Sequence, residues 1–278
     1  MKTLASEKDI EKVDLTLQRF ETLQTKANEL EESIRYAGSL QKSILPPTNH
    51  FNEIFDDAFV LYQPKDIVGG DFYWLAQFER EVYFAVGDCT GHGVPGAMVN
   101  IAGNTILRQL IRKQGLSDPA AIIEELDSEL IGLFNENKSE GQTYDGMDIV
   151  FCKFNLDDMI GSYCGAGRPL VMVRDGEIIE HKKGLSSVGY HLFGEKSFET
   201  VEFELKKGDL FYLFSDGYTD QFGGDNIKKF NRRRFRNLLT SIADMDLAKQ
   251  KKELNLTLQN WMGNQEQIDD VCVLGIKI

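Results

Sequence analysis

The apolar residues of the chain follow two different patterns, one before residue 46 and one after it. From Val13 to Ile44 they recur every three or four positions, which places them on one narrow stripe of a long helix, close to a heptad repeat. Pro46 and Pro47 end this pattern, because proline disfavours helical geometry in the residue before it. The sequence therefore predicts one long helix over residues 1–45.

This N-terminal helix has two possible roles. It could pack along its own domain, or it could be a coiled-coil linker that dimerises or connects to an upstream sensor. The stripe is narrow and Gln, Glu and Lys occupy other positions, which favours the coiled coil. We therefore expect a coiled-coil-like linker helix over 1–45, a folded domain over 46–278, and a homodimer formed through the helix.

From about Phe51 onward, short apolar runs are bounded by turn residues, a pattern typical of β-strands. The runs that predict strands are Phe59–Tyr62, Phe72–Phe78, Val82–Val86, Ile149–Phe154, Ser162–Gly165, Leu170–Arg174, Val201–Leu205, Leu210–Phe214 and Val271–Ile278. Turn residues at Asp175-Gly176 and at Lys207-Gly208-Asp209 predict two hairpins.

Apolar residues at helical spacing predict three further helices. One follows Pro95 and runs to about Lys113, a second begins at Asp118-Pro119 and continues through Phe134, and a third covers Asp246–Met262. Many consecutive strands with few helices between them favour antiparallel sheets covered by helices over a doubly wound parallel sheet.

Charge and composition exclude several classes of protein. The chain has 31 Lys+Arg against 44 Asp+Glu, a net charge of −13, whereas binding nucleic acid or an anionic membrane surface needs a basic surplus. No apolar stretch is long enough to span a bilayer, and the N-terminus lacks the apolar centre of a signal peptide. The four cysteines are scattered without CxxC spacing, which favours buried thiols in a reducing compartment. We expect a cytoplasmic protein with no nucleic-acid partner and no direct membrane span.

Aspartates stand beside glycine at the ends of several predicted strands. Asp71 precedes one strand, Asp88 closes another, Asp216 follows a third, and the pair Asp269-Asp270 precedes the last. Any one of them alone would be an ordinary turn residue. Several carboxylates gathered at rigid strand ends without Cys or His partners suit hard, oxygen-preferring cations such as Mg²⁺ or Mn²⁺.

Other catalytic signatures are missing from the sequence. There is no GxxxxGK[ST] phosphate loop, no GxSxG nucleophile elbow and no HExxH zinc helix. With no clear nucleophile beside a base, hydrolysis by a metal-activated water is the simplest hypothesis.

Four motifs in the same order and spacing give the chain a family resemblance. They are Gly69-Gly70-Asp71-Phe72-Tyr73, the run from Gly87 to Ala97 (GDCTGHGVPGA), Ser215-Asp216-Gly217-Tyr218-Thr219-Asp220, and Asp269-Asp270-Val271. Together they resemble the SpoIIE/RsbU-like serine phosphatases, the bacterial branch of the metal-dependent protein phosphatases of type 2C. The resemblance covers roughly residues 34–278 and includes Leu40–Pro47, which looks like the family's junction between linker helix and phosphatase domain.

The resemblance implies an α+β fold, an α-β-β-α sandwich of two antiparallel sheets flanked by helices, with a two-metal centre at one edge. Two divalent cations, Mn²⁺ or Mg²⁺, would activate the attacking water and neutralise the phosphate oxygens. Asp88 matches the aspartate that bridges both ions, and the backbone carbonyl of Cys89 matches a further ligand. Asp216 and the pair Asp269-Asp270 match the aspartates of the second metal, with Asp269 favoured as the ligand and Asp270 as a ligand or its support. Asp71 matches the family's first acidic position.

The family removes phosphate from phosphoserine or phosphothreonine, typically on anti-sigma-factor antagonists of the STAS type. The resemblance therefore implies a protein serine/threonine phosphatase regulated through its N-terminal helix, with a phosphorylated STAS-type protein as partner. Two alternatives stay open. One is a non-catalytic partner-switching module with a phosphatase-like fold, and the other is a hydrolase of small phosphoesters or nucleotides.

Three features fall outside the shared motifs. The family often has His or Asn after Ala-Gly, where this chain has Arg168, which we expect to be a surface salt bridge or a weak substrate-binding contact to phosphate. The basic segment KKFNRRRFR over Lys228–Arg236 could bind an acidic phosphoprotein or could be a solvated helix face. Asp145 and Asp148 are expected to be turn residues, with Asp148 close enough to support the site.

Overall fold

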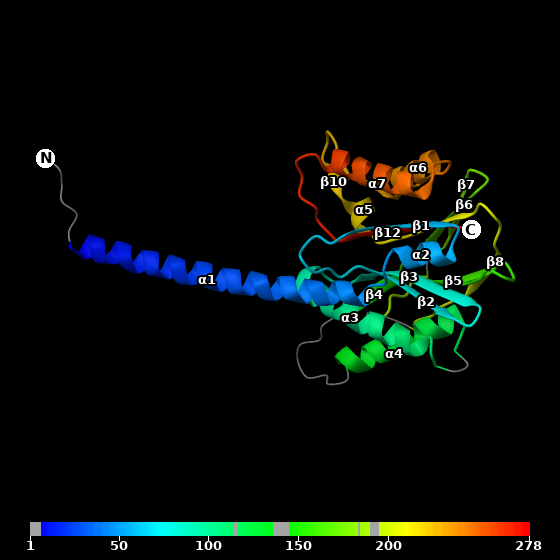
Figure 1. Cartoon of the computed structure of the whole chain (residues 1–278), viewed down its shortest axis with the longest axis horizontal. Coiled ribbons are helices and arrows are strands. Elements are labelled where there is room, and N and C mark those ends of the chain that lie inside the picture. The colour runs from blue at the N-terminus through cyan, green and yellow to red at the C-terminus, as the bar shows by residue number, and fades with distance from the viewer. Residues whose placement is uncertain (1–6, 114–115, 136–144, 183, 190–194) are drawn as a thin grey trace.

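Two five-stranded antiparallel sheets stack face to face, and one long helix projects from the stack (Figure 1). The computed structural model describes residues 7–113, 116–135, 145–182, 184–189 and 195–278, and the side chains of residues 7–14 and 135 are outside this description. Helices cover the outer face of each sheet, so the predicted α-β-β-α sandwich is confirmed.

The first sheet has the strand order β1-β12-β9-β6-β7. Its strands are β1 (Asp57–Gln63), β12 (Val271–Lys277), β9 (Leu210–Phe214), β6 (Leu170–Arg174) and β7 (Glu177–His181). The second sheet has the order β2-β3-β4-β5-β8. Its strands are β2 (Phe72–Phe78), β3 (Glu81–Cys89), β4 (Met147–Asn155), β5 (Ile160–Ala166) and β8 (Val201–Glu204). All the predicted strands are present, but β7 was not predicted.

Helices α3 (Gly93–Leu110) and α4 (Pro119–Asn135) lie on the outer face of the second sheet. Helices α6 (Arg232–Ile242) and α7 (Leu247–Met262) lie on the outer face of the first sheet. Three shorter elements complete the fold: α2 (Asn49–Ile54), α5 (Gly217–Asp220) and the small hairpin β10 (Phe222–Gly223) with β11 (Lys228–Lys229). The predicted cap at Asp118 is confirmed, because its side chain accepts a hydrogen bond from the Ala121 N–H, and Asp246 caps α7 in the same way by accepting from the Lys249 N–H.

Two apolar cores hold the layers together. The larger fills the space between the sheets and under α3 and α4, and it contains a run of aromatic edge-to-face contacts such as Phe84–Phe154 and Phe154–Phe211. The smaller lies between the first sheet and helices α6 and α7, around Tyr218 and Phe235. The four cysteines are free and buried, as predicted. Because helices cover the outer faces and the larger core fills the space between the sheets, the central strands β3, β9 and β12 are buried along most of their length.

One predicted hairpin is confirmed and the other is wrong. Asp175 and Gly176 have φ angles of 52° and 78° and join the antiparallel strands β6 and β7. Lys207-Gly208-Asp209 instead connects β8 in one sheet to β9 in the other. There, the buried Asp209 carboxylate accepts hydrogen bonds from Arg174 and from the Lys206 backbone N–H, so the segment crosses between sheets as a fixed turn.

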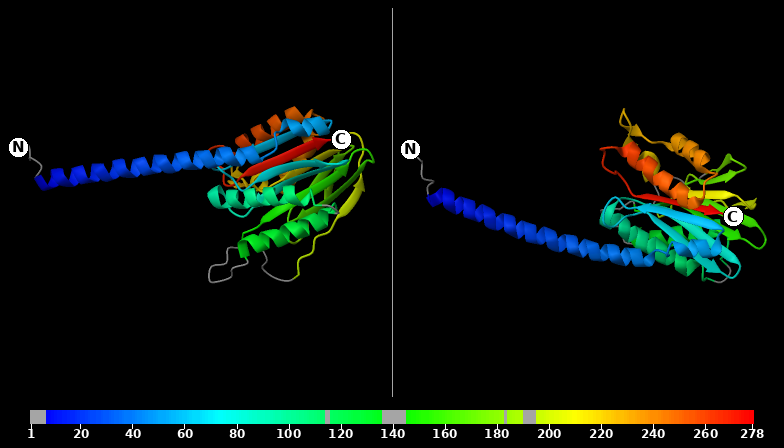
Figure 2. Two further views of the ribbon diagram at one scale, coloured as in Figure 1. Left: turned by 60° about the horizontal axis from the view of Figure 1, so that its bottom comes forward. Right: turned by 45° about the horizontal axis from the view of Figure 1, so that its top comes forward.

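The long helix α1 (Glu7–Ile44) extends well beyond the sandwich, as all the views in Figures 1 and 2 show. Among the α1 residues whose side chains are described, 15–44, the buried ones lie at the C-terminal end, at Gly38 and Gln41. Residues of the predicted stripe farther up the helix are exposed: Leu17 by 54%, Phe20 by 62%, Leu23 by 67% and Leu30 by 63%. The helix is therefore confirmed, and it does not pack along its own domain over that length. None of the helices described is both long enough and apolar enough to cross a membrane.

Candidate active site

A pocket of about 240 Å³ opens where the two sheets end together. It is lined by Asp88, Cys89, Thr90, Gly91, Met147, Asp148, Arg168, Ser187, Asp216 and Asp269. Asp88 and Cys89 close β3, Asp216 follows β9, and Asp269 lies just before β12. The pocket thus brings together four of the predicted metal ligands from strand ends of both sheets.

Asp148 stands beside Asp88 because of strand register. In the antiparallel pair β3 and β4, Asp88 lies opposite Asp148, and Cys89 lies opposite Met147. Asp148 is thus a strand residue of the pocket and not a turn residue, and the expectation that it could support the site is confirmed in position. Like charges facing each other across a ladder are destabilising, so this pair needs a cation between its members or beside it.

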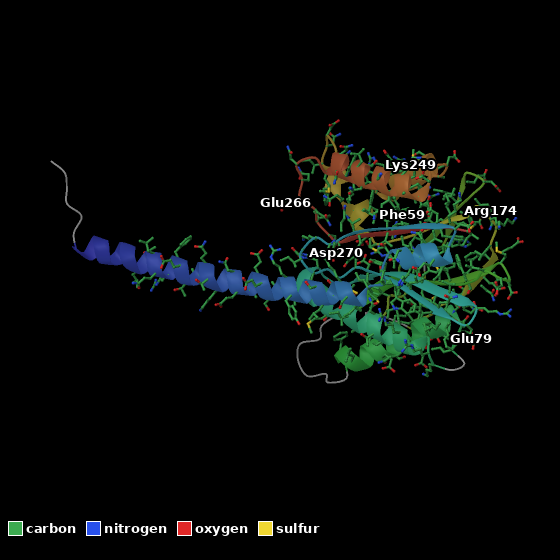
Figure 3. All side chains as sticks on the ribbon, in the orientation of Figure 1. Phe59, Glu79, Arg174, Lys249, Glu266 and Asp270 are labelled. Carbon is green, nitrogen blue, oxygen red and sulfur yellow. The ribbon has the colours of Figure 1, made fainter. Side chains whose placement is uncertain are left out.

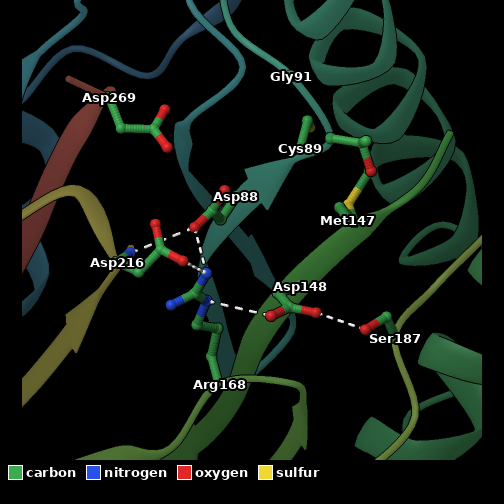
Figure 4. Close-up of a pocket in the computed structure, with 10 residues that line it drawn as sticks. Asp88, Cys89, Gly91, Met147, Asp148, Arg168, Ser187, Asp216 and Asp269 are labelled. Carbon is green, nitrogen blue, oxygen red and sulfur yellow. Dashed lines mark hydrogen bonds and ion pairs between the residues drawn. The ribbon is translucent and has the colours of Figure 1, made fainter. Parts of the chain in front are cut away.

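Arg168 supplies such a cation, and it is buried, so the prediction of a surface salt bridge is wrong. Its side chain is 7% exposed, and its Nη2 donates hydrogen bonds to Oδ2 of Asp88 and, at 2.8 Å, to Oδ2 of Asp216. Its Nε lies 3.5 Å from Oδ2 of Asp148, whose other oxygen accepts a hydrogen bond from Ser187 Oγ (Figure 4). One guanidinium therefore contacts three carboxylates.

Burial and repulsion from neighbouring carboxylates raise the pKa values of two pocket residues, Asp88 and Asp269. Burial raises the pKa of Asp88 to about 7, with Arg168 opposing the shift and Asp216 adding to it. Burial also raises the pKa of Asp269. Burial acts to lower the pKa of Arg168, but Asp88, Asp216 and Asp148 together raise it above its ordinary value. Ionising these buried carboxyls therefore costs free energy, and a cation bound beside them lowers that cost.

Asp71 and Asp270, the two remaining candidates, lie behind the pocket and do not line it. The Asp71 carboxylate is buried, its pKa is raised by burial and then by Asp88, and its Oδ2 accepts no hydrogen bond from the described residues. Both oxygens of Asp270 are in use, because Oδ1 accepts from the Lys65 N–H at 2.7 Å and Oδ2 from the Gly70 N–H at 2.6 Å. Asp270 therefore fixes the 65–70 loop, while its neighbour Asp269 faces the pocket.

Side chains at positions 69 and 70 would clash with neighbouring segments, which explains why both residues of this loop are glycine. A Cβ at Gly69 would lie 2.8 Å from the Asp270 carboxylate, and a Cβ at Gly70 would lie 2.7 Å from the Gly91 carbonyl oxygen. Only glycine lets the loop before Asp71 approach both segments.

The chemistry of this donor set fits divalent cations. The acidic side chains of the pocket offer carboxylate oxygens, the ligands preferred by Mg²⁺ and Mn²⁺. Behind them, Oδ2 of Asp71 is buried and has no hydrogen-bond donor among the residues described. Within the described ranges no three Asp, Glu, His or Cys side chains are already arranged around one point as ligands. Two of the carboxylates instead turn toward Arg168.

The basic segment is only partly free to bind a partner. Lys229 pairs with Asp220, Arg234 lies over the Trp261 ring at 4.8 Å, and Arg236 pairs with Glu180. Lys228, Arg232 and Arg233 are exposed. About half of the segment therefore stabilises α6 and the β10–β11 hairpin.

Sequence reasoning missed Ser187 and underestimated both Asp148 and Arg168. Asp148 could be recognised only by aligning β4 antiparallel to β3, since its sequence neighbours resemble an ordinary turn. Ser187 lies in a segment without periodicity, and no signal in the sequence marks it.

Sequence comparisons relate the chain to known bacterial phosphatases. The family model of stage II sporulation protein E (SpoIIE) matches residues 79–278. The phosphoserine phosphatase RsbU of Bacillus subtilis (strain 168) is 21% identical over 215 residues, covering 74% of this chain and 59% of RsbU. The chain thus spans less than two thirds of that relative.

Solved structures extend the likeness over the fold. The SiaA-PP2C domain of Pseudomonas aeruginosa is 30% identical, with a TM-score of 0.81 over 91% of this chain and 98% of that one. The PP2C phosphatase domain of SpoIIE from Bacillus subtilis, solved with a fragment of its regulatory domain, is 18% identical, with a TM-score of 0.63 over 80% of this chain and 61% of that one. Since the family model matches well over half of the chain, the chain belongs to the SpoIIE family, the SpoIIE/RsbU-like serine phosphatases of the PP2C type.

Proposed function

We propose that this chain hydrolyses phosphoserine or phosphothreonine on a signalling protein of the STAS type, using a water activated by two divalent cations, Mg²⁺ or Mn²⁺. The observation that carries the proposal is the convergence of Asp88, Asp216 and Asp269 in one pocket from strand ends of both sheets. Family membership supports the reaction class, and the oxygen donors support the choice of ion.

The residues have distinct proposed roles. Asp88, Asp216, Asp269 and the Cys89 carbonyl would hold the cations, with Asp71 close behind Asp88, and the placement of Asp270 favours support of the loop over ligation. When bound, the cations would supply a Lewis acid for the attacking water and positive charge for the phosphoryl oxygens. Arg168 is a substrate-binding candidate, because its Nη1 donates to none of the described residues and phosphate prefers forked donors.

Acidity does not prevent an acidic protein from binding this substrate. A phosphoserine carries a charge of about −1.5 to −2 near neutral pH. The chain has a net charge of −13, so the phosphate needs a locally positive field. Cations in the pocket together with Arg168 would provide it.

We further propose that residues 1–45 regulate the domain over 46–278. Gln41 on α1 donates from Nε2 to the Gly69 carbonyl at 2.6 Å and accepts from the Gly69 N–H at 3.1 Å. The next residue, Gly70, is held by Asp270, and Asp71 follows. This short chain of contacts joins the helix to the candidate metal ligands and would let a change in α1 reach the site. The exposed stripe of α1 would pair with that of a second copy to form a homodimer.

Phosphate release from a phosphoserine STAS protein tests the reaction. We expect release with Mn²⁺ or Mg²⁺, none with EDTA, and loss of about a thousandfold or more in Asp88→Asn, comparable to removing a key electrostatic contact from an active site. Asp157→Asn is the matched control, because Asp157 is exposed on the protein surface. Metal-independent release would contradict the proposal. Metal binding without hydrolysis would favour the partner-switching module, and faster hydrolysis of nucleotides than of the phosphoprotein would favour a small-molecule hydrolase.

A further inference from the structure

The Arg168 guanidinium shares its acceptors with the proposed cations. Its Nη2 donates to Oδ2 of Asp88 and to Oδ2 of Asp216. The backbone N–H of Asp216 also donates to the same Asp88 oxygen, at 3.2 Å. Oδ2 of Asp88 therefore already has two donors, and a cation that binds there must displace at least the guanidinium.

The backbone around Arg168 is built to bring its side chain to this position. Gly167 has a φ of +76°, and a Cβ there would lie 2.1 Å from Oδ1 of Asp148. The Gly167 N–H donates to the Gly184 carbonyl at 3.3 Å, and Gly167 also bridges to Ile149 of β4. The left-handed conformation of Gly167 turns the chain after β5 toward the pocket. The next side chain, Arg168, therefore reaches the carboxylates.

The directions of the carboxylates agree with this arrangement. Asp88 and Asp216 point to Arg168, and within the described residues no three ligating side chains surround a common point. A buried arginine between carboxylates is stable only while it keeps its partners, because an unpaired buried charge is costly. The guanidinium and a divalent cation therefore stabilise the same carboxylates in two mutually exclusive arrangements.

We propose that Arg168 competes with divalent cations for Asp88 and Asp216 and so lowers the affinity of the site for metal. The inference rests on the proposed metal-dependent function but concerns binding of the ion, not hydrolysis. Its consequence is a site that stays folded and electrostatically balanced through Arg168 and that fills only when the concentration of cation is high enough to displace the guanidinium.

Calorimetric titration of the full chain with Mn²⁺ tests the proposal without an activity assay. Arg168→Gln removes the competing charge, so the Kd for Mn²⁺ should fall by about tenfold or more, the effect of one or two hydrogen bonds to a charged group. Arg168→Lys keeps the charge but loses the fork, and its Kd should lie between those of Arg168→Gln and the wild type. Arg174→Gln is the matched control, since Arg174 also pairs with a buried aspartate, Asp209, but lies toward the end of the sandwich opposite Asp270 (Figure 3).

Thermal unfolding gives a second readout. In EDTA the Tm of Arg168→Gln should be lower than that of the wild type, and saturating Mn²⁺ should close most of the gap. Arg174→Gln should lower the Tm equally in both conditions. If Arg168→Gln is too unstable in EDTA for calorimetry, its Tm at increasing Mn²⁺ still reports the affinity relative to Arg168→Lys.

Each outcome separates the inference from the proposed function. An unchanged or weaker Mn²⁺ affinity in a folded Arg168→Gln protein would overturn the competition while leaving the phosphatase proposal intact. Absence of Mn²⁺ binding in wild type and both variants would overturn both. Binding that appears only in the variants would support the competition in its strongest form.

Discussion

Asp88 and Asp148 face each other across the antiparallel strands β3 and β4, and the guanidinium of Arg168 contacts both carboxylates. Two carboxylates at facing positions would repel each other and destabilise the pairing of the two strands. The positive charge of the Arg168 guanidinium offsets this repulsion. The arrangement makes the end of the second sheet depend on a residue from the β5–β6 connection. The stability of the fold and the chemistry of the pocket are therefore linked through the same three side chains.

The glycine before Arg168 should be needed for both stability and activity. Gly167→Ala places a methyl group 2.1 Å from the Asp148 carboxylate and adds the cost of a left-handed φ. We expect a clear loss of stability in urea unfolding and a fall in phosphate release of about a hundredfold, since small displacements of positioning groups cost that much.

Gly176→Ala is the control for Gly167→Ala. Gly176 has a similar φ of +78°, but a Cβ there meets nothing within 4 Å. It should cost only about 1–2 kcal/mol for the backbone conformation and leave phosphate release unchanged. Equal effects of the two substitutions would show that contact with Asp148 is unimportant.

The junction between α1 and the Gly69 loop should respond to loss of one amide. Gln41→Ala leaves the Gly69 N–H and carbonyl without their partner on α1, which should cost about 1–3 kcal/mol of stability. If α1 regulates the site through this contact, phosphate release should fall as well, measured at a temperature where the protein is fully folded. Gln24→Ala, at an exposed position of the same helix, should change neither quantity. A Gln41→Ala protein that is less stable but fully active would limit the contact to a structural role.

The exposed stripe of α1 should set the oligomeric state. Leu23→Glu combined with Leu30→Glu places two charges on the stripe, and light scattering should report half the mass of the wild-type particle. Gln18→Glu combined with Gln24→Glu adds the same charge at neighbouring exposed positions and should leave the mass unchanged. A wild-type protein that is already monomeric at high concentration would contradict the predicted homodimer.

The contribution of His181 to stability should be lost as the pH drops below 6.5, opposite in sign to the effect of the raised carboxyl pKa values in the pocket. Burial, and then Arg174, lower the pKa of His181 from 6.5, and its ring stacks on Phe203 at 4.9 Å. Between the folded and unfolded pKa values the unfolded chain binds more protons, so stability rises with pH in that window and is fully present above 6.5. His181→Phe keeps the stacking and should remove the His181 contribution from the slope of unfolding free energy against pH below 6.5, whereas the exposed His50→Phe should leave that contribution in place. An unchanged slope in His181→Phe would assign the effect to other groups.

The sequence was sufficient to predict most of the fold because its signals are local. Strands such as β6 and β9 are continuous apolar runs that are buried on both faces, and α7 has a capping aspartate and regular apolar spacing. The edge strand β7 was missed because its side chains are largely exposed and show no alternation. The turn at Lys207–Asp209 was assigned to a hairpin because its residues favour a reversal, while the choice of sheet depends on distant pairing partners.

Some residues of the candidate site could likewise be predicted from local sequence, whereas others depend on distant strand pairing. Asp88 and Asp216 were predicted to converge because each stands beside glycine at the end of an apolar strand, and Asp269 because it stands just before the last strand; all three do line one pocket. The burial of Arg168 could not be predicted, because it follows from the register that sets Asp148 opposite Asp88 and from the left-handed Gly167. A charged residue after a turn looks solvent-exposed until the strands around it are placed.

The paired hydrogen bonds between Gln41 and Gly69 have a geometric consequence for α1. Successive residues of a helix are rotated by about 100°, so turning α1 by one position would present Leu40 or Lys42 to Gly69 in place of Gln41. Neither side chain can both donate to a carbonyl and accept from an N–H group. The two hydrogen bonds therefore depend on the rotation of the helix about its own axis, and a rotation by one residue would break both of them next to the loop that leads to Asp71.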